Sequence, residues 1–366
     1  MGHTAARTEL LMSKPTIAVI GHSCVDLYLV GLMDWPCVEG ERADAQRIEY
    51  HPGGNGLNVA INLAKLGGID VSLYTAIVRG AHADLVQRAC RFQNPRESQR
   101  DRLVLLSDTV SIHFPSVPQG MHTSLSVVKL DNAGLGNFAY APGASEYLTS
   151  DFLSQHFENI SFVDFVYITG VGALAGLRYE DLAAFLRRLR EANSSLRVAA
   201  DVILCSQATA EQEGIVQKVC TFLPYVDLFV PNEAEALQYS AQNSIDNAAH
   251  AFNKLIQGAT IIKRGENGVN VYRKGEDQVE NVAAYSAENV SNFRVADTVG
   301  AGDAWGAGFA ASLVRDKEIR DACLVGNAVA ARCIQQYGAT TNTGEYEWIV
   351  DWIAQHADPG TFGLAD

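Results

Sequence analysis

Hydrophobic positions along the chain change their spacing several times, and each change predicts an element. Thr16 to Ile20 is a continuous apolar run that ends at Gly21, which is typical of a strand covered on both faces. From Thr149 onward, short apolar runs alternate with stretches of helical spacing. The predicted strands are 165–168, 197–200, 227–230 and 260–263, and the predicted helices are 151–158, 179–192, 211–223, 233–239, 246–257, 301–315, 318–335 and 346–356. This rhythm predicts an α/β fold in three layers (α/β/α), with a mainly parallel central sheet between helices.

The N-terminal half interrupts this rhythm with more polar segments. Residues 43–50, 122–129 and 137–141 have the pattern of half-exposed strands, and Asp131-Asn132-Ala133-Gly134 between the last two favours a hairpin. These strands do not fit the main sheet, so we expect a small separate sheet. The remaining segments predict a helix at 57–66, a strand at 71–78, a helix at 81–92, a solvated loop at 91–102, one or two short strands within 104–114, and antiparallel strands at 268–272 and 277–284.

Composition narrows the class of protein. The 366 residues are 48% hydrophobic and 19% charged, which is ordinary for a globular protein, and the formal net charge is −14. This acidity argues against nucleic acids and anionic membranes as partners. No apolar run reaches membrane-spanning length. The seven cysteines form no Cys-x-x-Cys pair and the nine histidines show no metal-ligand spacing, so we expect reduced thiols and a cytoplasmic protein.

The sequence Asp297-Thr298-Val299-Gly300-Ala301-Gly302-Asp303 is the most informative motif. A turn of small residues leads into the apolar helix that follows, and a helix N-terminus with free amides attracts phosphate. Asp303 in the first turn would repel that phosphate unless it is there to accept a proton. The motif therefore indicates phosphoryl transfer to a hydroxyl, whereas the plain alternative is a tight helix start with an acidic residue favoured by the dipole.

Polar residues near two predicted turns suit a polyol. Asp26 follows the first strand and could accept hydroxyl hydrogen bonds, although a turn aspartate is the plain alternative. The run Gly53-Gly54-Asn55-Gly56-Leu57-Asn58 offers close backbone approach and amide groups, or simply a glycine turn with a helix cap.

Three further segments offer groups for a nucleotide or a cation. Asn232 and Glu235 lie on one helical face and could hold Mg²⁺ through water, although Asn232 is also explained as a helix cap. Lys263, Gly265 and Gly268 end a predicted strand and permit close approach to a nucleotide, or form a surface hairpin. Asn327 lies in a helix of small residues that could form a wall of an adenine pocket or permit close helix packing.

Together these residues resemble the PfkB family, the ribokinase-like carbohydrate kinases, in order over about residues 14–357. Residues 297–303 resemble the family's C-terminal signature, residues 53–60 its N-terminal signature, and Asn232 to Glu235 its Asn-x-x-Glu motif. The resemblance implies transfer of the γ-phosphoryl group of ATP to a small sugar and a small β-sheet lid, with strands from about 43–51 and 122–141. It implies these roles: base, Asp303; anion hole, Gly300, Ala301 and Gly302; sugar binding, Asp26, Gly53, Gly54, Asn55 and Asn58; nucleotide binding, Lys263, Gly265, Gly268 and Asn327; Mg²⁺, Asn232 and Glu235; a monovalent cation such as K⁺, Asp297 and Val299.

The chain departs from the family pattern in two places. Residues 77–84 lack the Gly-x-Asp stretch usual there, and residues 91–120 form a longer segment. We expect residues 14–357 to form one kinase domain between an N-terminal tail, 1–13, and a C-terminal tail, 358–366. A strand lid leaves an exposed edge, which a homodimer would cover.

Two other functions compete with a sugar kinase. The first is a nucleoside kinase of the same fold, for which Phe114 and Phe138 are candidate aromatic contacts to a base. The second is a non-catalytic sugar- or nucleotide-binding regulator. A dinucleotide oxidoreductase is disfavoured because no Gly-x-Gly-x-x-Gly follows the first strand.

Overall fold

A computed structural model describes residues 14–32, 44–78, 91–92, 104–105, 110–130, 136–205 and 214–356. Both predicted tails lie outside these ranges, as does most of the departure at 77–84. The main sheet has nine strands in the order β15-β14-β13-β12-β11-β10-β1-β4-β7. From edge to edge they are β15 (Val279–Val282), β14 (Val269–Arg273), β13 (Ala259–Lys263), β12 (Leu228–Phe229), β11 (Arg197–Val202), β10 (Phe165–Val171), β1 (Thr16–Ile20), β4 (Asp70–Tyr74) and β7 (Val110–His113).

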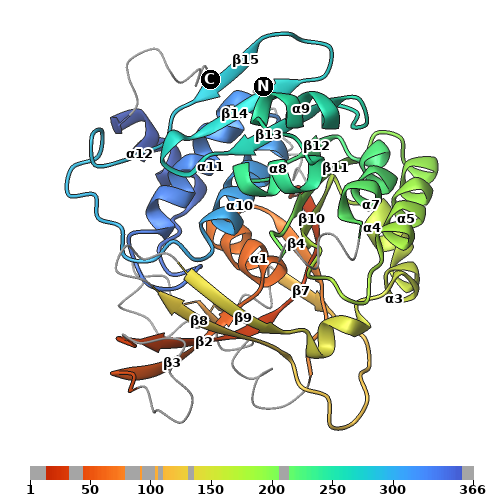
Figure 1. Ribbon diagram of the computed structural model, residues 1–366, viewed down its shortest axis with the longest axis horizontal. Coiled ribbons are helices and arrows are strands. Elements are labelled where there is room, and N and C mark those ends of the chain that lie inside the picture. Colours follow the sequence, from red (N-terminus) through yellow and green to blue (C-terminus); the bar gives the residue numbers. More distant parts are fainter. Residues whose placement is uncertain are drawn as a thin grey trace, which may run out of the picture.

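The strands from β13 to β7 are parallel, and β14 and β15 add an antiparallel hairpin at one edge. Alternate residues of each central strand point to opposite faces: Ile17 and Val19 pack into one apolar core, Ala18 and Ile20 into the other. The first core is covered by α1 (Asn55–Leu66), α10 (Ala301–Leu313), α11 (Ile319–Cys333) and α12 (Tyr346–His356). The second is covered by α3 (Ser150–Gln155), α4 (Phe157–Ser161), α5 (Tyr179–Ala192), α7 (Ile215–Phe222), α8 (Glu233–Ser240) and α9 (Ile245–Asn253) (Figure 1).

These two helical layers confirm the predicted three-layer fold. Three short 3₁₀ helices, η3 (Gly143–Tyr147), η4 (Leu223–Tyr225) and η5 (Gly265–Asn267), complete the connections. No helix within the described ranges is long and apolar enough to cross a membrane. Within the same ranges, no disulfide bond is formed by Cys24, Cys205, Cys220, Cys323 or Cys333.

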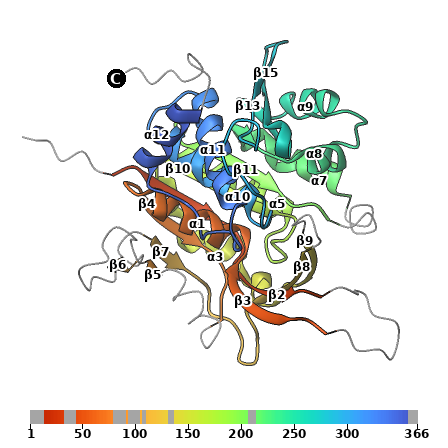
Figure 2. The ribbon, with the colours of Figure 1, turned by 90° about the vertical axis from the view of Figure 1, so that its left-hand side faces the viewer.

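The second, smaller sheet projects from the main body (Figure 2). Its strands run in the order β3 (Arg47–Gly53), β2 (Cys24–Val30), β8 (Ser124–Leu130) and β9 (Gly136–Ala141). The predicted separate sheet is therefore confirmed. The sequence predicted β3, β8 and β9 but not β2. Asp26, predicted to lie in a loop after the first strand, lies within β2, because the chain crosses from the main sheet into the small sheet in only three residues, 21–23.

Several predicted boundaries also change. The strand expected at 71–78 ends at Tyr74, and the helix expected at 151–158 is split into α3 and α4 at His156. Residues 81–90 of the predicted helix at 81–92 lie outside the described ranges, and its last two residues instead form β5 (Arg91–Phe92), paired with β6 (Val104–Leu105). The helix expected at 211–223 begins at Ile215 within the described part.

Candidate active site

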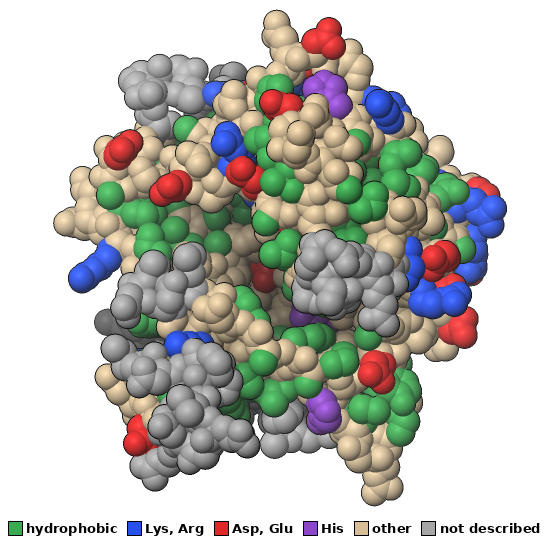
Figure 3. All heavy atoms as spheres, in the orientation of Figure 1, with side chains coloured by type: hydrophobic (Ala, Val, Ile, Leu, Met, Phe, Trp, Pro, Cys, Tyr) green, Lys and Arg blue, Asp and Glu red, His purple; other side chains and the backbone are tan. Residues whose placement is uncertain are grey.

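Several predicted site residues, among them Asn55, Asn58 and Asp303, come together near a hollow between the small sheet and the main body. Figure 3 shows this hollow near the centre of one face, with an acidic side chain in its depth. The N-termini of α1 and α10 meet there, and their side chains connect directly. Parallel strands direct their carboxyl ends to one edge, which is where ligands bind in open α/β sheets.

Asp303 is held by two asparagines from α1. Asn55 Nδ2 donates to Asp303 Oδ1 and Asn58 Nδ2 donates to Oδ2, both at 2.8 Å. Asp303 is only 5% exposed. Burial raises its pKa to about 7, although the two amide hydrogen bonds act to lower it. The carboxyl group is thus fixed in orientation and able to exchange a proton near neutral pH.

The turn before Asp303 has a backbone that only glycine adopts easily. Gly300 has φ 76°, and a Cβ there would lie 2.1 Å from the Cβ of Ala339. The Ala301 amide donates to the Thr298 carbonyl at 3.2 Å. Within the described ranges, the Gly300 and Gly302 amides make no hydrogen bond, so they remain the free donors of the expected anion hole.

Lys263 brings a positive charge to this turn. A Cβ built on Gly302 would lie 3.7 Å from Lys263 Nζ, so the ammonium group faces the start of α10. Lys263 Nζ also lies 3.9 Å from Asp201 Oδ2. Backbone amides and a partly buried cation therefore lie close together at the start of α10.

Asp201 is a member of the site that sequence reasoning missed. It lies at the carboxyl end of β11, is buried, and accepts a hydrogen bond from the Gly170 amide at 2.6 Å. Burial raises the pKa of its carboxyl, and Lys263 opposes this shift. The available signal was an aspartate at the end of a buried apolar run, the same pattern that drew attention to Asp26.

Asn232 and Glu235 form a capping box at the start of α8. The Asn232 side chain accepts from the Glu235 amide at 2.9 Å, and Glu235 Oε2 accepts from the Asn232 amide at 2.7 Å. The plain interpretation of Asn232 as a helix cap is confirmed. Burial also raises the Glu235 pKa to about 7, while Lys263 acts to lower it, so this carboxyl belongs to the same charge cluster as Asp201 and Asp303.

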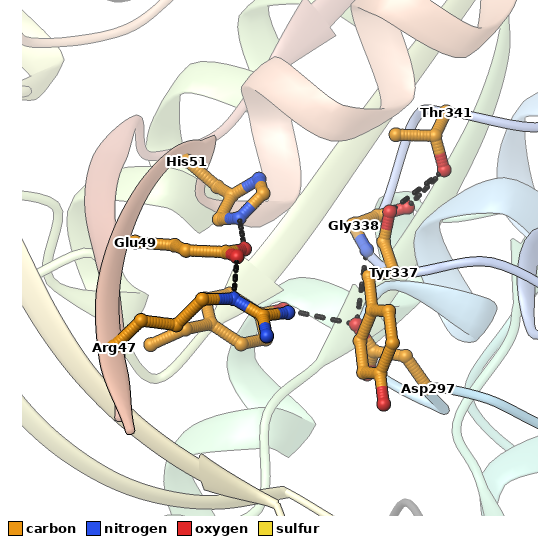
Figure 4. A network of polar contacts seen from close by, with 8 residues as sticks. Arg47, Glu49, His51, Asp297, Tyr337, Gly338 and Thr341 are labelled. Carbon is orange, nitrogen blue, oxygen red and sulfur yellow. Dashed lines mark hydrogen bonds and ion pairs between the residues drawn. The ribbon is translucent and has the colours of Figure 1, made fainter. Parts of the chain in front are cut away.

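Asp297 ties three segments together. Its Oδ1 accepts from the Val299 amide at 2.9 Å, and its Oδ2 accepts from the Gly338 amide at 3.0 Å and from the Tyr28 hydroxyl at 3.3 Å. Figure 4 shows Asp297 beside Gly338. Arg47, Glu49 and His51 of β3 face the segment that contains Gly338. Tyr28 was also missed from sequence, and it links the small sheet to the motif that precedes Gly300.

Asp26 faces the hollow from the small sheet. A Cβ on Gly53 would lie 2.0 Å from Asp26 Oδ2, so the absence of a side chain at Gly53 makes room for this carboxylate. The Cys24 thiol donates to Asp26 Oδ1 at 3.0 Å. Burial raises the pKa of that thiol, and Asp26 and Asp303 raise it further, so Cys24 lies near both carboxylates. Burial raises the Asp26 pKa to about 6.

The sequence that forms this site matches a known family. The model of the family described as "pfkB family carbohydrate kinase" matches residues 14–94 and 97–345. The chain belongs to this family.

Relatives of this family member include both sugar and nucleoside kinases. A ribokinase from Haemophilus influenzae is 23% identical over 323 residues, covering 87% of this chain and 92% of that protein. An adenosine kinase from Schizosaccharomyces pombe is 27% identical over 135 residues, covering 34% and 38%. Among solved structures, ribokinase from Giardia lamblia has a TM-score of 0.73 at 16% identity, covering 93% and 99%. Arabidopsis thaliana ribokinase complexed with ribose and ATP has a TM-score of 0.68 at 21% identity, covering 92% and 98%. The structural likeness establishes a ribokinase-like fold.

Of the other predicted nucleotide contacts of this pfkB family member, Asn327 and Gly268 have local structural roles. The Asn327 amide accepts from Trp305 Nε1 at 2.9 Å and donates to the Val282 and Ala283 carbonyls at 3.2 and 2.8 Å. It therefore ties α10 and α11 to the end of β15. Gly268 packs against the same carbonyl of Val282, whereas space beside Gly265 is open.

Proposed function

We propose that this protein transfers the γ-phosphoryl group of ATP to a hydroxyl of a small sugar or sugar-derived acceptor. The observation that carries the proposal is the buried Asp303 carboxyl, held by Asn55 and Asn58 one residue beyond a turn with free amides. Membership of a carbohydrate kinase family supports the reaction class.

The proposed catalytic residues have two roles, removal of a proton and stabilisation of charge. Asp303 accepts the proton of the acceptor hydroxyl. The hydroxyl oxygen forms the new bond to the γ-phosphorus, and the bond between that phosphorus and the oxygen of the ADP leaving group breaks. The Gly300 and Gly302 amides, with Ala301 completing the turn, and Lys263 stabilise the phosphoryl oxygens. Positioning and preorganised electrostatics of this kind supply most of the catalysis in phosphoryl transfer.

ATP supplies the phosphoryl group, and the residues present fit it. The open space at Gly265 and the ammonium of Lys263 above Gly302 suit a polyphosphate, with Gly268 and Asn327 shaping the adjoining wall. Asn232 and Glu235 would hold Mg²⁺ through water, because Glu235 provides a buried carboxyl within the Lys263 cluster. Asp297 and the Val299 carbonyl would hold a monovalent cation such as K⁺, although the described contacts of Asp297 are amides and a hydroxyl.

The acceptor would lie between α1 and the small sheet. Asp26 would accept its hydroxyl hydrogen bonds, and Gly53 and Gly54 would let it approach the backbone. Asn58 Oδ1 is buried and has no hydrogen-bond partner in the described part of the chain, so it offers an acceptor for a substrate hydroxyl. Asn55 would orient Asp303 beside that hydroxyl. The small sheet would act as a lid that excludes water during transfer.

A nucleoside kinase is the second candidate, favoured by the similarity to adenosine kinases. Both candidates are tested by measuring ADP release across pentoses, hexoses, ketoses and nucleosides with Mg²⁺ and K⁺ present. Acceptor-dependent ADP release that disappears in Asp303→Asn supports the proposal. Calorimetry that shows ligand binding without any ADP release would instead indicate a non-catalytic regulator.

A further inference from the structure

Two aromatic side chains stand exposed on β9 of the small sheet. Phe138 is 59% exposed and Tyr140 is 39% exposed. They are separated by one residue, so they project from the same face of the strand. Large exposed aromatic rings next to each other on one face are informative because folding alone does not require them.

Strand register shows which face this is. Tyr140 pairs with Ser126, which pairs with Asp26, and Phe138 pairs with Val128, which pairs with Tyr28. Directly paired residues lie on one side of a sheet. Asp26 and Tyr28 face the site, since Tyr28 bonds to Asp297 and the thiol of Cys24 lies near both Asp26 and Asp303. Phe138 and Tyr140 therefore face the hollow.

Both rings lie close to groups of the proposed site. A Cβ on Gly136 would lie 2.7 Å from Phe138 Cζ and 3.0 Å from Val299 Cγ2, so the edge of the Phe138 ring approaches the motif that precedes Gly300. The Tyr140 hydroxyl shares a 3.0 Å hydrogen bond with Ser145 Oγ, which fixes its ring. Phe114, the other candidate aromatic, follows β7 and lines a separate hollow with His113 and His156.

We propose that the acceptor is a nucleoside, a polyol joined to a flat heteroaromatic ring that stacks on Phe138 and Tyr140. This inference rests on the proposed kinase reaction, and of the two candidate acceptors of that site it chooses the nucleoside over a free sugar. Asp26 and Asn58 satisfy hydroxyl groups, but a free sugar that fills only their polar pocket leaves both rings in water. A heteroaromatic ring attached to that sugar covers them, and stacking on aromatic side chains is favourable for every base.

His22 adds a hydrogen-bonding group beside this wall. Its ring meets Tyr140 edge to face, with 5.5 Å between centroids. Its Nδ1 is buried and has no hydrogen-bond partner among the described residues. Burial lowers its pKa to about 4, so the imidazole is neutral at pH 7 and suits a neutral heterocycle better than an acidic sugar.

The experiment compares adenosine, inosine, uridine and cytidine with free ribose in wild type, Phe138→Ala and Phe162→Ala. Phe162 is 85% exposed and lies at the opposite, amino-terminal edge of the sheet, near Thr16 and Asp70, so it is the matched control. Phosphorylation is measured by ADP release, and binding is measured by calorimetry. Because Phe138 is exposed, its truncation should leave the fold intact, and Tyr140→Leu gives an independent second variant.

We expect at least one nucleoside to exceed ribose about 10-fold or more in kcat/KM. Phe138→Ala should lower that nucleoside's value about 10-fold, mainly through KM, and change ribose less than twofold, while Phe162→Ala changes neither. The inference is overturned if ribose or another free sugar matches every nucleoside, or if Phe138→Ala reduces ribose and nucleoside equally. If no compound yields ADP, the proposed kinase activity fails. Calorimetry then still tests this inference, because it compares the affinities for nucleosides and for ribose in wild type and Phe138→Ala.

Discussion

Asp303 shows how its surroundings set the chemistry of one carboxyl group. A helix N-terminus normally favours the charged form of an acid, and two asparagine amides add to that effect. Burial outweighs both and raises its pKa to about 7. A carboxyl that is ready to gain and lose a proton at neutral pH is what a general base needs.

The pH dependence follows from the direction of this shift. Below pH 7 Asp303 is mostly protonated and cannot accept the hydroxyl proton, whereas above pH 7 it is mostly ionised. We expect kcat/KM for the acceptor, at saturating ATP, to rise about tenfold per pH unit below 7 and to level off above it. Asp303→Asn should lower kcat about 10²- to 10⁴-fold. An exposed control, Asp351→Asn, should keep full activity, and a flat profile from pH 5 to 8 would contradict the assignment.

Lys263 should tune this base as well as bind phosphate. Its charge lowers the pKa of Asp303, so Lys263→Met should move the rise in activity to higher pH. The variant should also raise KM for ATP, because the ammonium near Gly302 is lost. The measurement is a pair of pH profiles compared with Lys254→Met, a control on an exposed side chain. An unchanged profile with only a higher KM for ATP would limit Lys263 to nucleotide binding.

Local sequence revealed some of these residues and concealed others. Asp303, Asn55 and Asn58 were identifiable because each lies beside a glycine turn that opens a helix. Their mutual hydrogen bonds were not, because they join residues 245 and 248 positions apart. Tyr28 was overlooked because its neighbours along the chain are apolar and its partner, Asp297, lies far away in sequence.

At the scale of elements, the strand β2 connects the proposed acceptor side of the site to its proposed phosphate side. It presents Asp26 to the hollow and Tyr28 to Asp297, whose other contacts hold the Val299 and Gly338 amides. Hydrogen bonds thereby link the small sheet to the turn before Gly300, which we propose as the anion hole.

Tyr28→Phe tests this link by removing one hydroxyl. Without its hydrogen bond to Asp297, the turn before Gly300 should be less well ordered when the acceptor binds. We expect kcat to fall roughly 5-fold, equivalent to about 1 kcal/mol, with less than a twofold change in acceptor KM. Tyr50→Phe, on the opposite face of the small sheet, is the matched control. A loss of acceptor affinity at constant kcat would show that Tyr28 acts on substrate binding instead.

Prediction of elements succeeded where local periodicity sufficed. The parallel strands β1, β10, β11 and β13 are continuous apolar runs, and their helices show clear amphipathic spacing. β2 was missed because Asp26 interrupts its apolar pattern, and its extended form depends on pairing with β3 and β8, which are distant in sequence. Such pairing cannot be derived from a local pattern.

At the scale of the whole molecule, alternating strands and helices predicted the layers but not the strand order. The position of β1 between β10 and β4 depends on crossovers that local sequence does not specify. The same applies to the small sheet: its strands were found, but its two faces could be assigned only from the register. One face carries the site, and the other carries Ile48 and Tyr50, which are 55% and 57% exposed.

The homodimer was predicted from the exposed edge of the small sheet, and this outer face offers a second surface for it. Ile48 and Tyr50 pair with Leu29 and Leu27, so the apolar surface continues across two strands. A stable dimer buries about 800 Å² on each partner, and covering this surface would remove exposed apolar groups from water. Light scattering should give twice the chain mass of 39.5 kDa.

The double variant Ile48→Asp and Tyr50→Asp should shift that mass to a single chain. Charged residues on both partners would meet across the interface and repel, whereas Phe162→Asp, remote from the small sheet, should leave the dimer intact. Since the altered face lies opposite Asp26, the variant should still bind acceptor, and calorimetry checks this. A single-chain mass for the unaltered protein at every concentration would remove the dimer, and it would leave the apolar outer face as a surface for some other contact.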